Sequence, residues 1–554
     1  MTNAYDEALK FKPDKHEAWN NRGIELGNLG RLEEAIASYD EALKFKPDKH
    51  EAWNNRGIAL GNLGRLEEAI ASYDNVLKFK PDDHEAWYYR GVVLADLGRI
   101  EEAIVSFDNA LKIKPDYYEA LDNRGVALLK LGRYDEAIAS FDNALKIKPD
   151  YHEACSYRGI ALFNLGKLEE AIASFDNTLK IKHGLHEAWN NQGSALGNLG
   201  RYEEEITSYD QALKFKPDYH QAWNNRGAAL DNLGRYEEAI ASYEQALKIK
   251  PDYHHAWNGR GNALLNLGRN EEAIASYDEA LKIKPDYHYA WYNRGTALAN
   301  LGRNEEAIAS YEQALKFKPD YHDTWYKRGA ALANLGRNEE AIASFDEALK
   351  IKPDDPETLH YRELALAYLM KLELEKQINT YDQLLNSNPN DHETWETKAS
   401  FLCLLGQYEE AIASYDNALK FKPDYHEAWY NRGNALFNLG RLEEAIVSFD
   451  QALKFKPDKD EAWNNRGVAL TNLGRVEEAI ASFDNALKFK PDEANPYFNK
   501  ACAYALQENI FLAIENLKRA INLDSEYLEI AKTDTDFDKI RNMPSFQALI
   551  TEKS

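Results

Sequence analysis

Tryptophan recurs through this chain at one phase of a 34-residue period, with a single two-residue slip after residue 359. A fixed period of this length is typical of a solenoid, in which one small unit is stacked many times. Each unit of a solenoid contacts only its neighbours, so the chain has no single core and no enclosed active site. Function must therefore be sought on one long, repetitive surface. The tryptophans are Trp19, Trp53, Trp87, Trp189, Trp223, Trp257, Trp291, Trp325, Trp395, Trp429 and Trp463, and Leu121, Cys155, Leu359 and Tyr497 take the same place in the other units.

Charge and cysteine content narrow the class of protein. The formal net charge is −25, from 67 Lys and Arg against 92 Asp and Glu, and an acidic surface repels phosphate backbones. The three cysteines lie far apart and form no CxxC pair, which favours a reducing compartment. No apolar run has the length of a membrane span, and the N-terminus has no apolar secretory segment. We expect a cytoplasmic protein with no nucleic-acid partner and no membrane insertion.

One unit, residues 50–83, predicts two antiparallel helices. We number its residues from position 1 at His50 to position 34, and we use the same positions in the other units. Asp48 followed three residues later by Glu51 predicts a capping box at the start of the first helix. Gly64 predicts the turn between the helices, and Pro81 ends the second helix.

The apolar positions of the first helix lie on one side when they are spaced at 100° per residue. The glycine at position 8, Gly57 in this unit, lets a partner helix approach closely. We expect the tryptophan at position 4 to fill the gap beside this glycine and to belong to the core. Ligand stacking on the tryptophans is the alternative.

At this point the unit resembles the tetratricopeptide repeat (TPR) family. The resemblance recurs fifteen times, in units that together cover residues 16–527. It implies an all-α fold, an α-solenoid that forms a right-handed superhelix of antiparallel helix pairs, with the first helix of each pair lining a concave groove. The residues that match the family signature in the unit 50–83 are Trp53, Gly57, Leu60, Ala69, Tyr73 and Pro81.

The period also predicts how the chain is divided. Residues 1–15 are a partial repeat with a second helix only, whose uncovered face predicts end-to-end self-association or a missing upstream segment. Residues 16–355 are ten regular TPR units, 356–391 an irregular unit with a two-residue insertion, 392–527 four further units, and 528–554 a C-terminal capping segment. The capping segment carries an apolar face made of Leu528, Ile530, Phe537, Ile540, Phe546 and Leu549.

The irregular unit, residues 356–391, breaks the pattern of the repeat. Glu363 replaces the glycine of position 8, and Met370 replaces the turn glycine. A carboxylate cannot stay where two helices touch at a glycine. We therefore expect an opened contact that separates the ten regular units from the last four.

Asparagine at position 6 forms a stripe on the first helices, opposite their apolar side. Asparagine is a mediocre helix former, so its recurrence in mid-helix indicates that its amide is used. The pattern resembles the asparagine ladder in the TPR arm of O-linked N-acetylglucosamine transferase, where this residue holds peptide backbone. Solvation, or simple copying in a recent duplication, is the alternative. The asparagine stripe consists of Asn21, Asn55, Asn123, Asn191, Asn225, Asn293, Asn431, Asn465 and Asn499.

Positions 5 and 9 vary between units while the packing positions barely change. This variation fits local selection of ligand side chains beside a constant stripe, although neutral drift of exposed residues predicts it too. The candidate specificity residues are Tyr88, Tyr292, Tyr326, Tyr430, Asn262 and Asn434.

No catalytic motif or cofactor-binding loop stands out, and the histidines at position 1 lie one repeat apart, too far to share a metal ion. We expect a non-enzymatic scaffold that binds an extended protein or peptide, with no cofactor and no metal. The alternative is the substrate-targeting arm of a larger enzyme, for example a glycosyltransferase, whose catalytic part lies outside this chain.

Overall fold

The computed structural model describes residues 9, 12 and 14–551. Most of the partial repeat 1–15 lies outside the described residues, so its predicted single helix and the self-association through its open face stay predictions. The chain divides into two compact units, one ending at Leu335 and one beginning at Gly336. The division falls between the two helices of the tenth repeat, and the separation expected at the irregular repeat stays a prediction.

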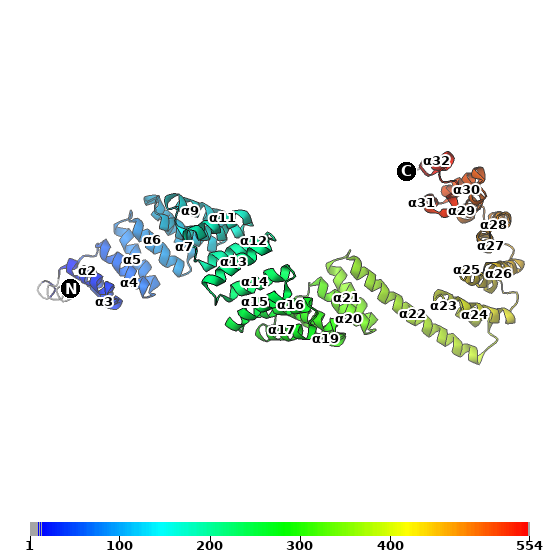
Figure 1. Cartoon of the computed structure of the whole chain (residues 1–554), viewed down its shortest axis with the longest axis horizontal. Coiled ribbons are helices and arrows are strands. Elements are labelled where there is room, and N and C mark those ends of the chain that lie inside the picture. Colours follow the sequence, from blue (N-terminus) through cyan, green and yellow to red (C-terminus); the bar gives the residue numbers. More distant parts are fainter. Residues whose placement is uncertain (1–8, 10–11, 13, 552–554) are drawn as a thin grey trace. The chain divides into compact units, whose positions relative to one another are not determined.

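Helices account for all the regular structure among the described residues, which form no β-strand. This confirms the predicted all-α solenoid of stacked helix pairs (Figure 1). The first unit contains α2 (His16–Asn28), α3 (Leu32–Phe45), α4 (His50–Asn62), α5 (Leu66–Phe79), α6 (His84–Asp96), α7 (Ile100–Ile113), α8 (Tyr118–Lys130), α9 (Tyr134–Ile147), α10 (His152–Asn164), α11 (Leu168–Ile181), α12 (His186–Asn198), α13 (Tyr202–Phe215), α14 (His220–Asn232), α15 (Tyr236–Ile249), α16 (His254–Asn266), α17 (Asn270–Ile283), α18 (His288–Asn300), α19 (Asn304–Phe317) and α20 (His322–Asn334).

The second unit continues the pattern with one interruption. It contains α21 (Asn338–Ile351), α22 (Pro356–Ser387), α23 (His392–Leu404), α24 (Tyr408–Phe421), α25 (His426–Asn438), α26 (Leu442–Phe455), α27 (Asp460–Asn472), α28 (Val476–Phe489), α29 (Ala494–Leu506), α30 (Ile510–Leu523), α31 (Glu526–Thr533), the 3-10 helix η1 (Thr535–Phe537) and α32 (Pro544–Thr551).

Most pairs close where an aromatic ring of the second helix packs on a glycine of the first. A Cβ atom placed on Gly57 would lie 2.8 Å from the ring of Tyr73, which is 1% exposed. The ring at position 24, not the tryptophan, therefore fills the gap beside the glycine, and that part of the sequence prediction is wrong. The turn glycine Gly64 has a φ of 75°, a left-handed value that L side chains rarely adopt.

The tryptophans lie at the edge of the core and anchor the turn between repeats. Trp53 is only partly buried, and its indole N–H donates to the carbonyl oxygen of Pro47 at 2.9 Å. The guanidinium of Arg56 lies over the indole ring, 5.6 Å from its centre. Because the ring joins the proline turn to the first helix, it reaches the surface instead of the interior.

Position 7 ties three successive helices together. Arg56 on α4 donates to Asp40 on α3 at 2.7 Å and to Ser72 on α5 at 2.7 Å. The same bridge recurs in most repeats, and it is charge-assisted on one side. These hydrogen bonds link successive helices through polar groups, in addition to the apolar packing between them.

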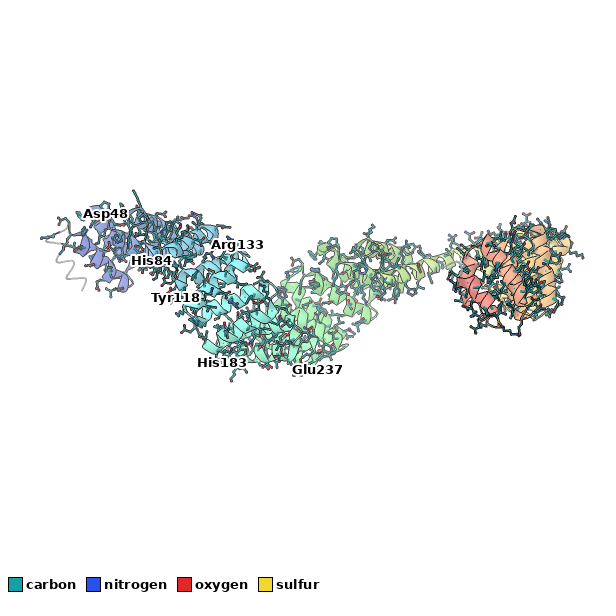
Figure 2. All side chains as sticks on the ribbon, turned by 90° about the horizontal axis from the view of Figure 1, so that it is seen from above. Asp48, His84, Tyr118, Arg133, His183 and Glu237 are labelled. Carbon is teal, nitrogen blue, oxygen red and sulfur yellow. The ribbon has the colours of Figure 1, made fainter. Side chains whose placement is uncertain are left out.

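The predicted capping box is wrong by one residue. The residue before α4 is Lys49, which makes no side-chain cap, and Asp48 lies one place too early in the turn after α3 (Figure 2). Where position 34 is itself an aspartate, the cap forms, as at Asp83, whose carboxylate accepts from the backbone N–H of Ala86 at 3.1 Å.

The irregular repeat is not a helix pair. Residues Pro356–Ser387 form one continuous helix, α22, visible as a single rod in Figure 1. Three positions that hold a small residue in most repeats hold a larger one here. Glu363 replaces the packing glycine and Met370 the turn glycine. Gln377 replaces the alanine of position 20, once the two-residue insertion is allowed for. Without a residue suited to the left-handed turn, the helix runs on, and Glu363 is exposed.

The C-terminal segment packs on the last helix pair. Phe537 and Phe546 are 0% exposed and share an apolar cluster with Leu517 of α30. Ile530, expected on the same face, is instead 44% exposed. Its neighbours Leu528 and Ala531 take the buried side of the short helix α31.

Candidate functional site

The first helices of successive repeats touch one another. Contacts join α12 to α14 and α14 to α16 in the first unit, and α23 to α25 in the second. The second helices make no comparable contact in the described part of the chain. Within each unit the first helices therefore lie on the inner side of the stack, and the asparagine stripe runs across them.

Most of the stripe is hydrogen-bonded between repeats. Six of its asparagines donate an amide N–H to position 5 or 9 of the preceding first helix, 31 or 35 residues earlier in the chain. Asn293 donates to Asn262 at 2.9 Å, for example, and Asn431 to Glu396 at 3.2 Å. The stripe thus holds adjacent first helices together, a role that the sequence did not reveal.

The stripe residues differ in what they leave open. Asn123, Asn465 and Asn499 each donate to two acceptors, so both of their N–H groups are engaged, and the oxygen of Asn465 also accepts from Asn464 at 3.3 Å. Asn225, Asn293 and Asn431 donate once to the preceding repeat. Among the described residues, Asn21, Asn55 and Asn191 make no side-chain hydrogen bond to another residue.

Four of the predicted specificity residues are partners of the stripe. Tyr88 and Tyr430 accept through their hydroxyls from the next asparagine, at 3.1 and 3.2 Å, and Asn262 and Asn434 accept through their amide oxygens. Tyr292 packs its ring 5.2 Å from that of Tyr321. Tyr326 is only 9% exposed, so it does not offer an open surface.

Cavities open between neighbouring first helices. One, of about 250 Å³, lies in the second unit between α25 and α27 and combines an aromatic wall with amides. It is lined by Asn434, Phe437, Asn438, Asn465 and Val468. Two residues of the predicted site therefore meet at an actual depression of the surface.

A second cavity of about 250 Å³ lies in the first unit and contains a residue that sequence reasoning missed. Its lining is Ser194, Gly197 and Asn198 of α12, Glu205 and Tyr209 of α13, and Asn225, Ala228 and Asn232 of α14. Glu205 is 7% exposed, and burial raises the pKa of its carboxyl to about 7. The signal was present in the sequence, because position 20 is alanine in nearly every other repeat.

Two carboxyls of the first helices are also partly withdrawn from solvent. Burial raises the pKa of Asp122 to about 6, although a hydrogen bond from Tyr151 lowers it in part. Burial also raises the pKa of Asp231. The first helices of the first unit therefore carry carboxyls whose protonated form is favoured by burial.

One cluster of potential metal ligands occurs among the described residues, although the sequence predicted none. Cys502, Asp534 and Asp536 place one ligand atom each within 4.8 Å of one another. Burial raises the pKa of the Cys502 thiol, and the negative charges of Asp534 and Asp536 raise it further. The thiol also makes a hydrogen bond with Asp536. The protonated thiol is a hydrogen-bond donor within the C-terminal cap, and the η1 turn already uses Asp534 as its N-cap.

Family models cover most of the chain. The model described as tetratricopeptide repeat matches residues 3–50, 21–84, 54–118, 123–185, 158–220, 190–254, 224–288, 258–322 and 292–356. The chain belongs to the tetratricopeptide repeat family. Further TPR models match residues 380–413, 401–440, 433–474 and 460–493, which leaves residues 357–379 of α22 outside them.

Solved TPR structures resemble this TPR chain at low identity. YrrB is 23% identical over 34% of this chain and 97% of its own, with a TM-score of 0.31. A tetratricopeptide repeat protein of Parabacteroides merdae is 19% identical over 45% and 98%, with a TM-score of 0.37. The Naa15/Naa10 complex with HypK gives 16% identity over 97% and 100%, with a TM-score of 0.32. No curated protein matches the chain.

The TPR assignment sets the general class of function. Repeats of this family form scaffolds for interaction with other proteins, and this chain is a scaffold of that type. None of the helices that the structure describes is long and apolar enough to span a bilayer.

Proposed function

We propose that the inner surface of the first unit binds an extended polypeptide through the open amides of the asparagine stripe. The observation that carries the proposal is the unequal use of the stripe. Asn191 has a free amide and is followed in the next repeat by Asn225, which donates to Asn190 at 3.3 Å through one N–H. A free amide offers two donors and an acceptor, which match the carbonyl and N–H of a backbone of any sequence.

The surroundings of these two residues favour a ligand site. Both are partly buried between first helices, where a hydrogen bond to a ligand is sheltered from water. Asn225 also lines a cavity with Ser194 and Asn198, which can receive a side chain. A backbone held by amides, with side chains entering cavities, is a general way to combine affinity with selectivity.

The residues of the asparagine stripe are expected to differ in how much they contribute to binding. Asn191 and Asn55 are expected to contribute most to capture, because their amides are unused among the described residues. Asn465 and Asn499 are expected to contribute mainly to the stacking of repeats, since both of their N–H groups are engaged. Position 6 therefore serves two roles in different repeats.

The test uses dodecapeptides selected from a random phage-displayed library on the full chain. A selected peptide is then labelled, and its affinity is measured by fluorescence polarisation for the unmodified chain, the double variant Asn191→Ala with Asn225→Ala, and the control Asn177→Ala. Asn177 is exposed on the second helix α11, away from the stripe. Loss of two hydrogen bonds is expected to weaken binding roughly fivefold or more.

Helicity of the double variant, read by circular dichroism, separates capture from folding. Equal affinity for all three proteins would contradict the proposed groove. An equal loss in the Asn177→Ala control would contradict it as well.

A further inference from the structure

Glu205 stands at a position that the fold reserves for a small residue. Position 20 is alanine in every repeat of the array except two, which carry Glu205 and Gln377. The alanines of this position are 0% exposed, so packing gives no reason for a carboxylate. Gln377 belongs to the single helix α22, which leaves Glu205 as the exception among the helix pairs.

The structure makes room for this carboxylate and leaves half of it unused. A Cβ atom on Gly197 would lie 2.5 Å from the carboxylate carbon, so a larger residue at this place would displace the carboxylate of Glu205. Its Oε1 accepts from the hydroxyl of Tyr209 at 3.1 Å. Its Oε2 is buried and has no hydrogen-bond partner among the described residues.

The same repeat has also lost its usual cation. Position 7 is arginine or lysine in every other repeat, but here it is Gln192. The side-chain N–H of Gln192 donates to Asp176 at 2.6 Å, and its side-chain oxygen accepts from the hydroxyl of Ser208 at 3.0 Å. The link between the three helices is therefore kept without a positive charge. A buried carboxylate with no cation beside it is unfavourable unless something else supplies the charge.

We propose that the cavity beside Glu205 is a subsite for a lysine side chain of the bound polypeptide. The proposal rests on the proposed function and specifies the ligand residue. The cavity of about 250 Å³ is lined on one side by Glu205 and Tyr209 and on the others by the hydroxyl of Ser194 and the amides of Asn198, Asn225 and Asn232.

The donor count selects lysine over arginine. An ammonium group has three N–H donors. They suit the one carboxylate oxygen that lacks a hydrogen bond, together with neutral hydroxyl and amide oxygens. Arginine gains most from a carboxylate with both oxygens open, because its fork donates two parallel hydrogen bonds. Tyr209 already donates to one oxygen of Glu205, so two parallel hydrogen bonds from the fork are less favourable here.

The experiment compares selected dodecapeptides on three forms of the full chain: unmodified, Glu205→Gln and Glu203→Gln. Glu205→Gln keeps the shape of the side chain and removes its charge, while Glu203 is an exposed glutamate of the same helix and serves as the control. Each peptide is also made with norleucine, which is lysine without the ammonium group, and with arginine at the same place.

Lysine is expected at one register of the peptides selected on the unmodified chain and on the control. Exchange for norleucine should weaken binding to those two proteins roughly tenfold or more, and to Glu205→Gln by less than about twofold. Arginine should bind less well than lysine. A further variant, Glu205→Ala, restores the alanine of the other repeats and should behave as Glu205→Gln does.

The possible failures are distinguishable. Peptides that bind through Asn191 and Asn225 but tolerate norleucine would overturn the lysine subsite and leave the groove intact. Equal binding of arginine and lysine would overturn the choice of ligand residue. If no recovered peptide depends on the two asparagines, the proposed function fails and the subsite fails with it.

Discussion

Glu205 offers a sharp test of the electrostatics of the inner surface through its effect on stability. Burial raises its pKa from 4.5 to about 7, so the folded protein holds this proton more tightly than the unfolded chain does. The stabilisation from protonation is complete below pH 4.5 and is lost as the pH rises through about 7. A shift of this size corresponds to about 3 kcal/mol between the two limits, from about 1.4 kcal/mol for each pH unit.

Replacement of Glu205 by alanine should therefore stabilise α13 at pH 8 and have a smaller effect at pH 5. Because stability in a solenoid is a sum over neighbours, the change should be confined to α12, α13 and α14. Hydrogen exchange followed by mass spectrometry measures it. The ratio of variant to unmodified rates at one pH cancels the intrinsic exchange rate.

The protection ratio of α13 is expected to rise roughly tenfold or more between pH 5 and pH 8 for Glu205→Ala. The control Glu203→Ala, an exposed residue of the same helix, should show no such change. An equal ratio for Glu205→Ala at both pH values would refute the assignment of a buried, unpaired carboxyl.

Three other expectations follow from the packing. Tyr73→Ala should destabilise α4 and α5 by about 3–5 kcal/mol, seen as faster exchange there and not in α16 or α17; a uniform change along the array would contradict nearest-neighbour stacking. The centre of α22, where Met370 is 67% exposed, should exchange faster than residues 220–321, and equal protection would show that the missing hairpin has no consequence. The combined variant Glu363→Gly, Met370→Gly and Gln377→Ala should turn α22 into a helix pair, shortening the distance between spin labels at residues 361 and 384; an unchanged distance would show that other residues enforce the single helix.

The sequence predicted the repeating architecture because the period alone determines it. Proline, the turn glycine and the packing glycine recur at fixed places, and the structure turns or packs at Gly57, Gly64 and Pro81. The interruption at Glu363 and Met370 was visible too, although the sequence did not predict its outcome as one continuous helix.

The helix caps and the hydrogen-bond partners of the stripe could be identified only from the structure. Asp48 stands one position earlier in its repeat than Asp83 does. Asp83 caps a helix and Asp48 does not, and the spacing of residues in the sequence does not predict this difference. The partner of Asn293 lies 31 residues earlier, on a helix whose register against its neighbour is set by packing. The sequence identified the asparagine stripe but not the division of its amides between neighbours and solvent.

The most direct test of the central claim is to find where a bound polypeptide lies. The photo-reactive residue p-benzoylphenylalanine is placed at Asn198, an exposed residue beside the cavity on α12, and separately at Thr207, an exposed residue of the second helix α13. Each protein is irradiated with a selected dodecapeptide, and adducts are mapped by mass spectrometry. We predict adducts from Asn198 that excess unlabelled peptide suppresses, and none from Thr207. Adducts from Thr207 alone, or equally from both sites, would contradict binding along the inner surface.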